Sequence, residues 1–180
     1  STVAIFGQSG SGKSSLIKLL LGLEKPSTGN IRINGKNLSS INPLHLREQI
    51  GAVLHNDVLL AGDLAYNIDL GKEIYNQERL ANVCKLVGLI ELISSLPMGF
   101  QTQVGEMGNV FSAGQTQRIL IARALYKLPK ILVLDEALSN LGDEASISLL
   151  TSAKDLGITI VLVTHNISLK GVVDSEILIT

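Results

Sequence analysis

A glycine-rich stretch near the start of the chain carries the clearest chemical pattern in the sequence. It lies between an apolar run at 2–6 and an apolar-periodic segment at 16–23, and its third glycine is followed directly by lysine and serine. Glycines reach backbone angles closed to other residues, so successive N–H groups of such a loop can point inward around an anion. The following helix would add its unpaired N-terminal N–H groups and positive dipole end. We predict that a nucleoside triphosphate binds here, at Gly7, Gln8, Ser9, Gly10, Ser11, Gly12, Lys13, Ser14 and Ser15.

Two side chains of this loop have specific roles in the prediction. The Lys13 ammonium would bridge β- and γ-phosphate oxygens, and the Ser14 hydroxyl would ligate Mg²⁺. A glycine- and serine-rich turn before a helix can also be only a turn. Here the strand, the loop, the lysine–serine pair and the helix follow in the required order, which favours phosphate binding.

Two later apolar runs end in polar residues that suit the same chemistry. The run at 131–134 leads into Asp135 and Glu136, and the run at 158–163 leads into Thr164 and His165. The carboxyl ends of parallel strands face the crevice where ligands of α/β proteins bind. Asp135 could therefore hold Mg²⁺ through water, Glu136 could orient or deprotonate an attacking water, and His165 could contact the γ-phosphate. The alternatives are solvated carboxylates and a surface imidazole, and the glycine-rich loop in the same chain favours catalysis.

The rest of the pattern predicts the elements that position these residues. Short apolar runs predict strands at 2–6, 30–33, 50–54, 131–134, 158–163 and 175–180. Periodic apolar positions and capping residues predict helices at 16–23, 43–49, 63–68, 76–96, 113–126 and 143–156. This alternation predicts an α/β fold with a mainly parallel sheet core. The helical stretch at about 64–127 interrupts it, so we expect a helical subdomain inserted into a core of residues 1–63 and 128–180.

Composition excludes several classes of protein. The 180 residues fit one domain, and 15 basic against 16 acidic residues give a net charge of −1, so we expect no nucleic-acid partner. A single cysteine, Cys84, excludes an internal disulfide, and its apolar-periodic surroundings predict a small core residue. No apolar run approaches the roughly 18 residues that span a bilayer. The chain begins without Met in one predicted strand and ends in another, so we expect a segment of a longer protein.

The most specific stretch is F-S-A-G-Q-T-Q-R at residues 111–118, which leads into the helix before the Asp-Glu strand. It resembles the LSGGQ signature of ATP-binding cassette (ABC) proteins. A plain helix start with Ser112 as the N-cap is the alternative. The order of glycine-rich loop, signature, Asp-Glu pair and histidine favours the resemblance, which covers essentially the whole chain. It implies the P-loop NTPase fold of ABC ATPases, with ATP and Mg²⁺ as cofactors.

Two further segments resemble ABC exporters in particular. Q-V-G-E-M-G at 103–108 is similar to the exporter T-x-V-G-E-x-G segment, and 50–60 is similar to the exporter Q-loop region. This implies an ATP-hydrolysing motor domain on the cytoplasmic face of a membrane, as in exporters of bacteriocin-type peptides. It also implies a transmembrane domain as partner, fused or separate. Two nucleotide-binding domains would pair head to tail, as a homodimer, with each ATP between one P-loop and the partner's signature residues Ser112, Gly114 and Gln115.

Three residues depart from the family pattern. His55 stands where the family has a glutamine that touches Mg²⁺ and relays the nucleotide state to the membrane domain. Ala113 replaces the first signature glycine, which would cost roughly 1–2 kcal/mol if that site requires a positive φ. Gly142 stands where the family has an aspartate that reaches across the dimer. All three concern coupling or the shared interface, whereas the expected hydrolytic residues are present.

One expected contact and three rival functions remain. The adenine-stacking aromatic of this family precedes the first strand and would fall before the chain, and Tyr66, Tyr75 and Tyr126 are poor replacements.

One rival is a soluble ABC ATPase acting on DNA or ribosomes, but such proteins usually carry coiled-coil insertions or basic arms. A second is a catalytically weakened regulatory module. The signature argues against the third, a small-molecule kinase.

Overall fold

The computed structural model describes the chain except for residues 9, 34, 71–74 and 106–110. Its central sheet has five strands in the order β4 (Ile50–Val53), β7 (Ile131–Asp135), β8 (Thr159–Val163), β1 (Thr2–Gly7) and β9 (Ser175–Ile179). All neighbouring strands in this sheet are parallel. The predicted α/β fold with a parallel sheet core is thus confirmed, and the carboxyl ends of these strands share one edge.

The register of the sheet brings several predicted site residues to that edge. Val163 of β8 pairs with Ile5 of β1 and with Asp135 of β7. Leu134 pairs with Val53 of β4, so the segment after β4 leaves the sheet beside Asp135. Residues far apart in the sequence therefore meet where these strands end.

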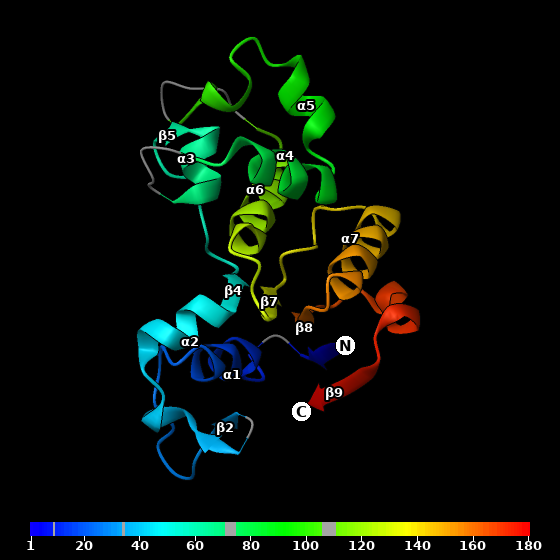
Figure 1. Cartoon of the computed structure of the whole chain (residues 1–180). Helices are drawn as coiled ribbons and strands as arrows, with labels where there is room; N and C mark the ends of the chain where they lie inside the picture. Colours follow the sequence, from blue (N-terminus) through cyan, green and yellow to red (C-terminus); the bar gives the residue numbers. More distant parts are fainter. Residues whose placement is uncertain (9, 34, 71–74, 106–110) are drawn as a thin grey trace.

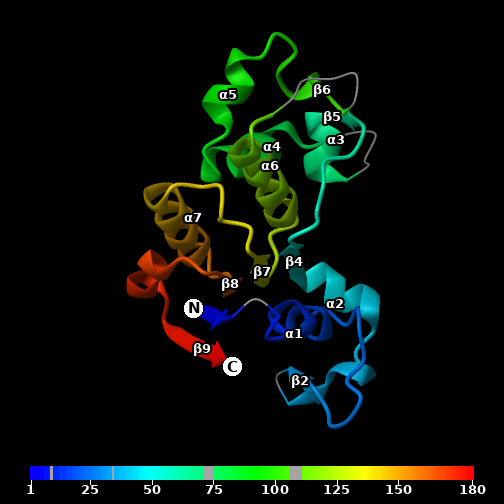
Figure 2. The ribbon, with the colours of Figure 1, turned by 180° about the vertical axis from the view of Figure 1, so that it is seen from behind.

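Helices cover both faces of the sheet, which explains why the central strands are apolar along their whole length. On one face, Ile5, Val133 and Val163 pack with Ile17 of α1 (Lys13–Leu20). Alternate residues of the strands point to the opposite face. There α6 (Ala113–Tyr126) and α7 (Asp143–Asp155) cover a core that includes Leu132, Leu134, Ile160 and Leu162. Figures 1 and 2 show α1 on one side of the strands and both other helices on the opposite side.

Of the four shorter helices in the described residues, three begin at side-chain caps, and the one at Ile90–Ser95 does not. The four are α2 (Pro43–Gln49), α3 (Leu64–Asp69), α4 (Gln77–Leu86) and α5 (Ile90–Ser95), with 3₁₀ turns at Leu38–Ser40, Gly99–Gln101 and Ile167–Val172. The Asn42 side chain accepts a hydrogen bond from the Leu44 N–H at 2.9 Å, and Asp63 accepts one from the Tyr66 N–H at 2.7 Å. These bonds satisfy N–H groups that a helix start leaves unpaired.

The helices α3, α4, α5 and part of α6 gather at one end of the molecule, away from α1 and α2 (Figures 1 and 2). Cys84 of α4 is fully buried in their core, as predicted, and burial raises the pKa of its thiol to about 12. α6 packs against α3 and α4 and also against β4 of the sheet. The division of the chain into a core and a helical subdomain at about 64 and 127 stays a prediction.

Two helix predictions were wrong for the same physical reason. The predicted helix 76–96 is broken into α4 and α5 at Gly88, and α1 ends at Leu20 rather than at residue 23. Gly88 has φ 69° and Gly22 has φ 67°, left-handed angles that end a helix at little cost for glycine. The following N–H groups donate back into the last turn, from Leu89 to the Cys84 carbonyl and from Leu23 to the Lys18 carbonyl.

Two small antiparallel pairs complete the described structure. β2 (Arg32–Ile33) pairs with β3 (Lys36–Asn37), so β2 confirms the strand predicted at 30–33 but is shorter, and residue 34 lies outside the described residues. A second pair joins β5 (Gly62–Asp63) with β6 (Gln103–Val104), outside the predicted strands. Of the exporter-like segment 103–108, residues 106–108 lie outside the described part of the chain. None of the helices described here is long and apolar enough to cross a membrane.

Candidate nucleotide site

The glycine-rich loop connects β1 to α1 at the carboxyl edge of the sheet. Gly10 and Gly12 have φ 82° and 91°, angles that residues with side chains rarely adopt. Gly7 lies tightly packed, since a Cβ there would come within 2.5 Å of the Ile179 carbonyl oxygen. Lys13 opens α1, with Ser14 and Ser15 in its first turn. The predicted Ser9 lies outside the described residues.

Lys13 is buried at 6% exposure and folds back over the loop. Its ammonium donates hydrogen bonds to the Gly7 carbonyl at 2.9 Å and to the Gln8 carbonyl at 2.7 Å. The buried Ser11 hydroxyl has no hydrogen-bond partner among the described residues. The loop thus holds a positive charge and an unpaired polar group, and both would gain from an anionic ligand.

The two carboxylates at the end of β7, Asp135 and Glu136, lie in different environments. Asp135 is buried at 4% exposure, whereas the Glu136 side chain is about one third exposed, at 31%. Glu136 has φ 56°, and its N–H donates to the Val163 carbonyl at 3.0 Å. A non-glycine residue in this conformation costs roughly 1–3 kcal/mol, and such strain occurs often at functional sites. The left-handed angle turns the chain sharply just after the strand.

Two histidines flank the Glu136 carboxylate. His165 Nε2 lies 2.8 Å from Oε1, and His55 Nδ1 lies 3.6 Å from Oε2. The sequence predicts that His165 lies near the phosphates, whereas His55 stands out in the sequence only as a departure from the family pattern. The pairing of β4 with β7 is what brings His55 to Glu136.

Two neighbouring cavities open along this edge. One of about 690 Å³ is lined by the glycine-rich loop, by His165 and by the end of β9. The other, of about 260 Å³, is lined by residues that include His55, Asp57, Asp135 and Glu136. The structure therefore brings the described loop residues, Asp135, Glu136 and His165 to the same part of the molecule.

The signature residues form the start of α6. Ser112 Oγ accepts a hydrogen bond from the Gln115 N–H at 3.2 Å, and Gln115 Oε1 accepts one from the Ser112 N–H at 2.9 Å. This capping box bears out the helix-cap interpretation of Ser112 as local structure. Ala113 is the first helical residue and is absent from the described residues with positive φ, so the anticipated strain does not arise. A Cβ at Gly114 would come within 2.8 Å of the Asn140 carbonyl oxygen, which explains the glycine.

Among the described residues, neither cavity at the strand edge is lined by Ser112, Gly114 or Gln115. Other residues of the same stretch, Ala113, Thr116 and Gln117, do line the 260 Å³ cavity. Gly142, the third departure, caps α7 with φ −64° and ψ 157°. In the described part of the chain, then, Ser112, Gly114 and Gln115 do not line the cavity of the glycine-rich loop.

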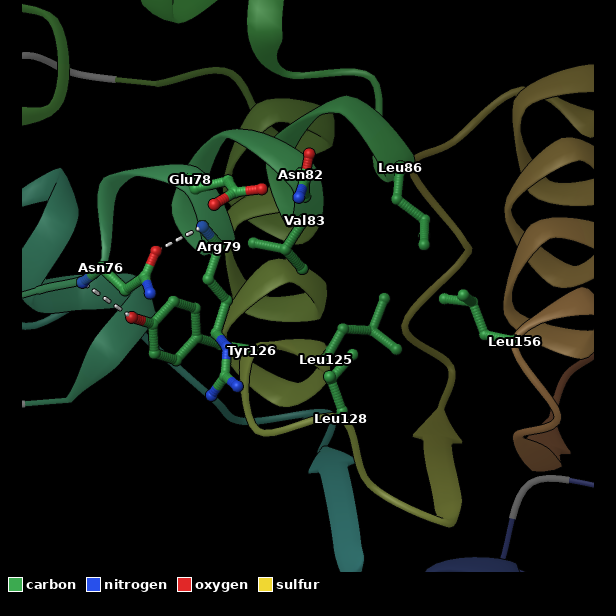
Figure 3. Close-up of a pocket in the computed structure, with 10 residues that line it drawn as sticks. All are labelled: Asn76, Glu78, Arg79, Asn82, Val83, Leu86, Leu125, Tyr126, Leu128 and Leu156. Carbon is green, nitrogen blue, oxygen red and sulfur yellow. Dashed lines mark hydrogen bonds between the residues drawn. The ribbon is translucent and has the colours of Figure 1, made fainter.

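A separate cavity of about 470 Å³ lies between α4 and α6 (Figure 3). Tyr126 lies on its wall, with its hydroxyl accepting a hydrogen bond from the Asn76 N–H at 3.4 Å and with the Arg79 guanidinium 5.6 Å from the ring centre. Burial raises the pKa of Tyr126. None of the predicted site residues lines this cavity among the described residues. Tyr126 therefore packs between α4 and α6, in a cavity that the described site residues do not line.

In the described residues, no group of three or more His, Cys, Asp or Glu side chains could hold a metal ion unaided. An ion at this edge would need ligands from a bound molecule in addition to protein oxygens. Triphosphate oxygens can supply such ligands, because Mg²⁺ in nucleotide sites is usually held by one or two carboxylates together with substrate phosphates.

Comparison with known proteins identifies the family. The sequence model of a family described as "ABC transporter" matches residues 1–139. The chain is 43% identical over 169 residues to "ABC transporter B family member 2" of Dictyostelium discoideum, covering 93% of this chain and 12% of that protein. It is 42% identical over 168 residues to the leukotoxin translocation ATP-binding protein LktB of Mannheimia glucosida, covering 92% and 24%.

A third relative is the colicin V secretion/processing ATP-binding protein CvaB of Escherichia coli, 37% identical over 176 residues, with coverages of 98% and 25%. The chain thus spans a quarter or less of the length of these relatives. Among solved structures, a bacterial Atm1-family ABC exporter with ATP bound matches with a TM-score of 0.91 and 32% identity, over 100% of this chain and 32% of that one. The resemblance to exporter-type ABC proteins and the predicted ABC ATPase fold are confirmed, and the chain belongs to the ABC transporter family.

Proposed function

We propose that this chain is the ATP-binding and ATP-hydrolysing domain of an ABC exporter. The observation that carries the proposal is the Glu136 carboxylate, which lies 2.8 Å from His165 at the strand edge where the glycine-rich loop begins. Supporting it are relatives named as ATP-binding proteins of secretion and translocation and the similarity to an ATP-bound exporter. The site would use Gly7, Gln8, Ser9, Gly10, Ser11, Gly12, Lys13, Ser14 and Ser15 toward the nucleotide.

The residues present fit a triphosphate with Mg²⁺. Lys13 would exchange its two backbone carbonyl partners for phosphate oxygens, and the Ser11 hydroxyl would gain the partner it lacks. Ser14 and Asp135 would hold Mg²⁺, since their donor atoms are oxygens, which this ion prefers. When bound, Mg²⁺ would offset negative charge on the phosphates.

Glu136 would act on the attacking water. Its carboxylate could accept the water proton, a role that typically accelerates a reaction about 10²–10⁴-fold. His165 would hold that carboxylate in place through its Nε2 and would lie near the terminal phosphate, because it lines the same cavity as the glycine-rich loop. The strained backbone of Glu136 would fix the direction of the side chain.

A second copy of this chain would complete the nucleotide-binding site. Ser112 is exposed at the start of α6, and neither cavity at the strand edge is lined by it within the described residues. Ser112, Gly114 and Gln115 would therefore serve the ATP held by the partner, in a homodimer that ATP closes and hydrolysis reopens. Sedimentation with and without Mg-ATP tests this pairing.

In the whole protein, the motor would act with a transmembrane domain at the cytoplasmic face of a membrane. The helical region at about 64–127 would pass the motion to that partner. Large apolar side chains that are exposed after His55 suit such a contact, namely Val58, Leu60, Tyr66 and Leu70. The secreted cargo of two relatives suggests a peptide or protein substrate.

Replacing one lysine tests nucleotide binding. Lys13→Ala removes the ammonium of the glycine-rich loop, so ATP binding should weaken sharply and phosphate release should stop. Lys18→Ala is the matched control, because Lys18 lies on the same helix but is half exposed and paired with Glu24 at 3.3 Å. Calorimetric ATP titration and a phosphate-release assay measure both effects. Equal behaviour of the two variants would refute the site, and wild-type binding without phosphate release would favour a regulatory module.

A further inference from the structure

We propose that His55 makes the nucleotide site of this chain prefer a first-row transition ion, Mn²⁺ or Co²⁺, over Mg²⁺. The inference rests on the proposed function, because the ion would enter with the triphosphate. Its structural basis is an imidazole beside Glu136, in the cavity that Asp135 also lines.

The position of His55 follows from the sheet. Val53, at the end of β4, pairs with Leu134, one residue before Asp135 in β7. His55, two residues after Val53, therefore lies at the strand edge next to Asp135 and Glu136. Its side chain is 67% exposed, so an ion entering the cavity could reach it.

The two histidines that flank Glu136 differ in their availability. His165 Nε2 is within hydrogen-bond distance of Oε1, at 2.8 Å. His55 Nδ1 is 3.6 Å from Oε2, too far for a hydrogen bond. The His55 ring is not committed to this carboxylate, so it can turn a nitrogen lone pair toward an ion at small cost.

The turn that carries His55 is held at both ends. The Asp57 side chain accepts a hydrogen bond from the Leu54 N–H at 2.9 Å, and the Asp57 N–H donates to the Leu54 carbonyl at 3.0 Å. Arg123, from α6, donates to the Val58 carbonyl at 3.1 Å. The imidazole is thus presented from an ordered turn, which lowers the entropy lost on coordination.

Ligand chemistry then decides which ion is preferred. Mg²⁺ demands oxygen ligands in near-ideal octahedral geometry. Mn²⁺ and Co²⁺ also accept octahedral oxygen sites, and Co²⁺ binds nitrogen ligands more strongly than Mn²⁺ does. Because the described residues offer no three-ligand metal group, protein ligands would be few and one imidazole would be a large share of them.

Pulsed EPR of the chain with Mn²⁺ and ATPγS tests this directly. An imidazole bound to Mn²⁺ gives a nitrogen coupling, which should be present in the wild type and lost in His55→Gln. His45→Gln is the matched control, because His45 is 70% exposed on α2 beside Glu48 and should keep the coupling. Adenine nitrogens are common to all samples and set the baseline.

Affinity provides a second measurement. Loss of a group that only supports a metal ligand typically reduces metal affinity about 10–100-fold. His55→Gln removes the proposed ligand itself, so it should shift the ratio of Mn²⁺-nucleotide affinity to Mg²⁺-nucleotide affinity by at least about tenfold toward Mg²⁺. An unchanged coupling and ratio in His55→Gln would overturn the inference, as would loss of the coupling in His165→Gln alone. With Mg-ATP binding intact, the proposed function would stand. Failure to bind nucleotide with either ion would overturn both.

Discussion

Arg123 of α6 ties three separate segments together, and its replacement should be costly. Its Nε donates to the Asn67 carbonyl at 2.7 Å, one terminal nitrogen donates to Asn67 Oδ1 at 2.8 Å, and the other donates to the Val58 carbonyl at 3.1 Å. Asn67 is fully buried and in turn donates to the carbonyls of Leu60 and Asp63. Arg123→Met should therefore loosen the segment that follows His55.

The size of the effect follows from these three bonds. A hydrogen bond to a charged group contributes about 1.5–3 kcal/mol and a neutral one about 1 kcal/mol. Arg123 is only partly buried, so each of its three bonds is given about 1 kcal/mol, the value of a neutral hydrogen bond, and methionine keeps much of the aliphatic packing. The free energy of unfolding of Arg123→Met should fall by about 3 kcal/mol.

Urea unfolding followed by circular dichroism measures this change. Arg79→Met is the matched control, because Arg79 is exposed on α4 and its guanidinium lies 5.6 Å from the centre of the Tyr126 ring. An exposed cation–π contact contributes about 0.5–1 kcal/mol, so the control should lose no more than that. Equal losses in the two variants would refute the structural role given to Arg123.

Two further substitutions test packing and backbone strain. Gly51→Ala would place a Cβ 2.3 Å from the Ala124 carbonyl oxygen and 2.9 Å from Pro129, and overpacking of this kind should lower the free energy of unfolding by about 1–3 kcal/mol. Gly171→Ala, where a Cβ meets nothing within 4 Å among the described residues, should change it by less than about 0.5 kcal/mol. Leu128 has φ 51° and is 59% exposed, so Leu128→Asn should raise the free energy of unfolding by about 1 kcal/mol. Thermal and urea unfolding check all three, and a destabilised Leu128→Asn would show that the leucine contributes packing that outweighs its strain.

Local patterns in the sequence were sufficient to predict the strands of the main sheet and most helices. Apolar runs buried on both faces mark β7 and β8, and Ser112 with Gln115 marks the start of α6. Because parallel strands end at a common edge, the meeting of the glycine-rich loop with Asp135, Glu136 and His165 could also be predicted.

Features that depend on distant residues could not be predicted in this way. The contact of His55 with Glu136 requires the pairing of β4 with β7, which no local pattern specifies. The left-handed angle of Glu136 occurs where its N–H donates to the Val163 carbonyl of another strand. Gly88 shows a further limit, since a glycine inside a periodic stretch can be tolerated in a helix or can end it.

The rate of phosphate release by Glu136→Gln tests the central claim most directly. Glutamine keeps the size of the side chain but cannot accept the proton of the attacking water. At saturating Mg-ATP, the variant should bind nucleotide as the wild type does and release phosphate about 10²–10⁴-fold more slowly. A Glu136→Gln variant that binds ATP and hydrolyses it at the wild-type rate would contradict the assignment of Glu136 as the residue that activates water.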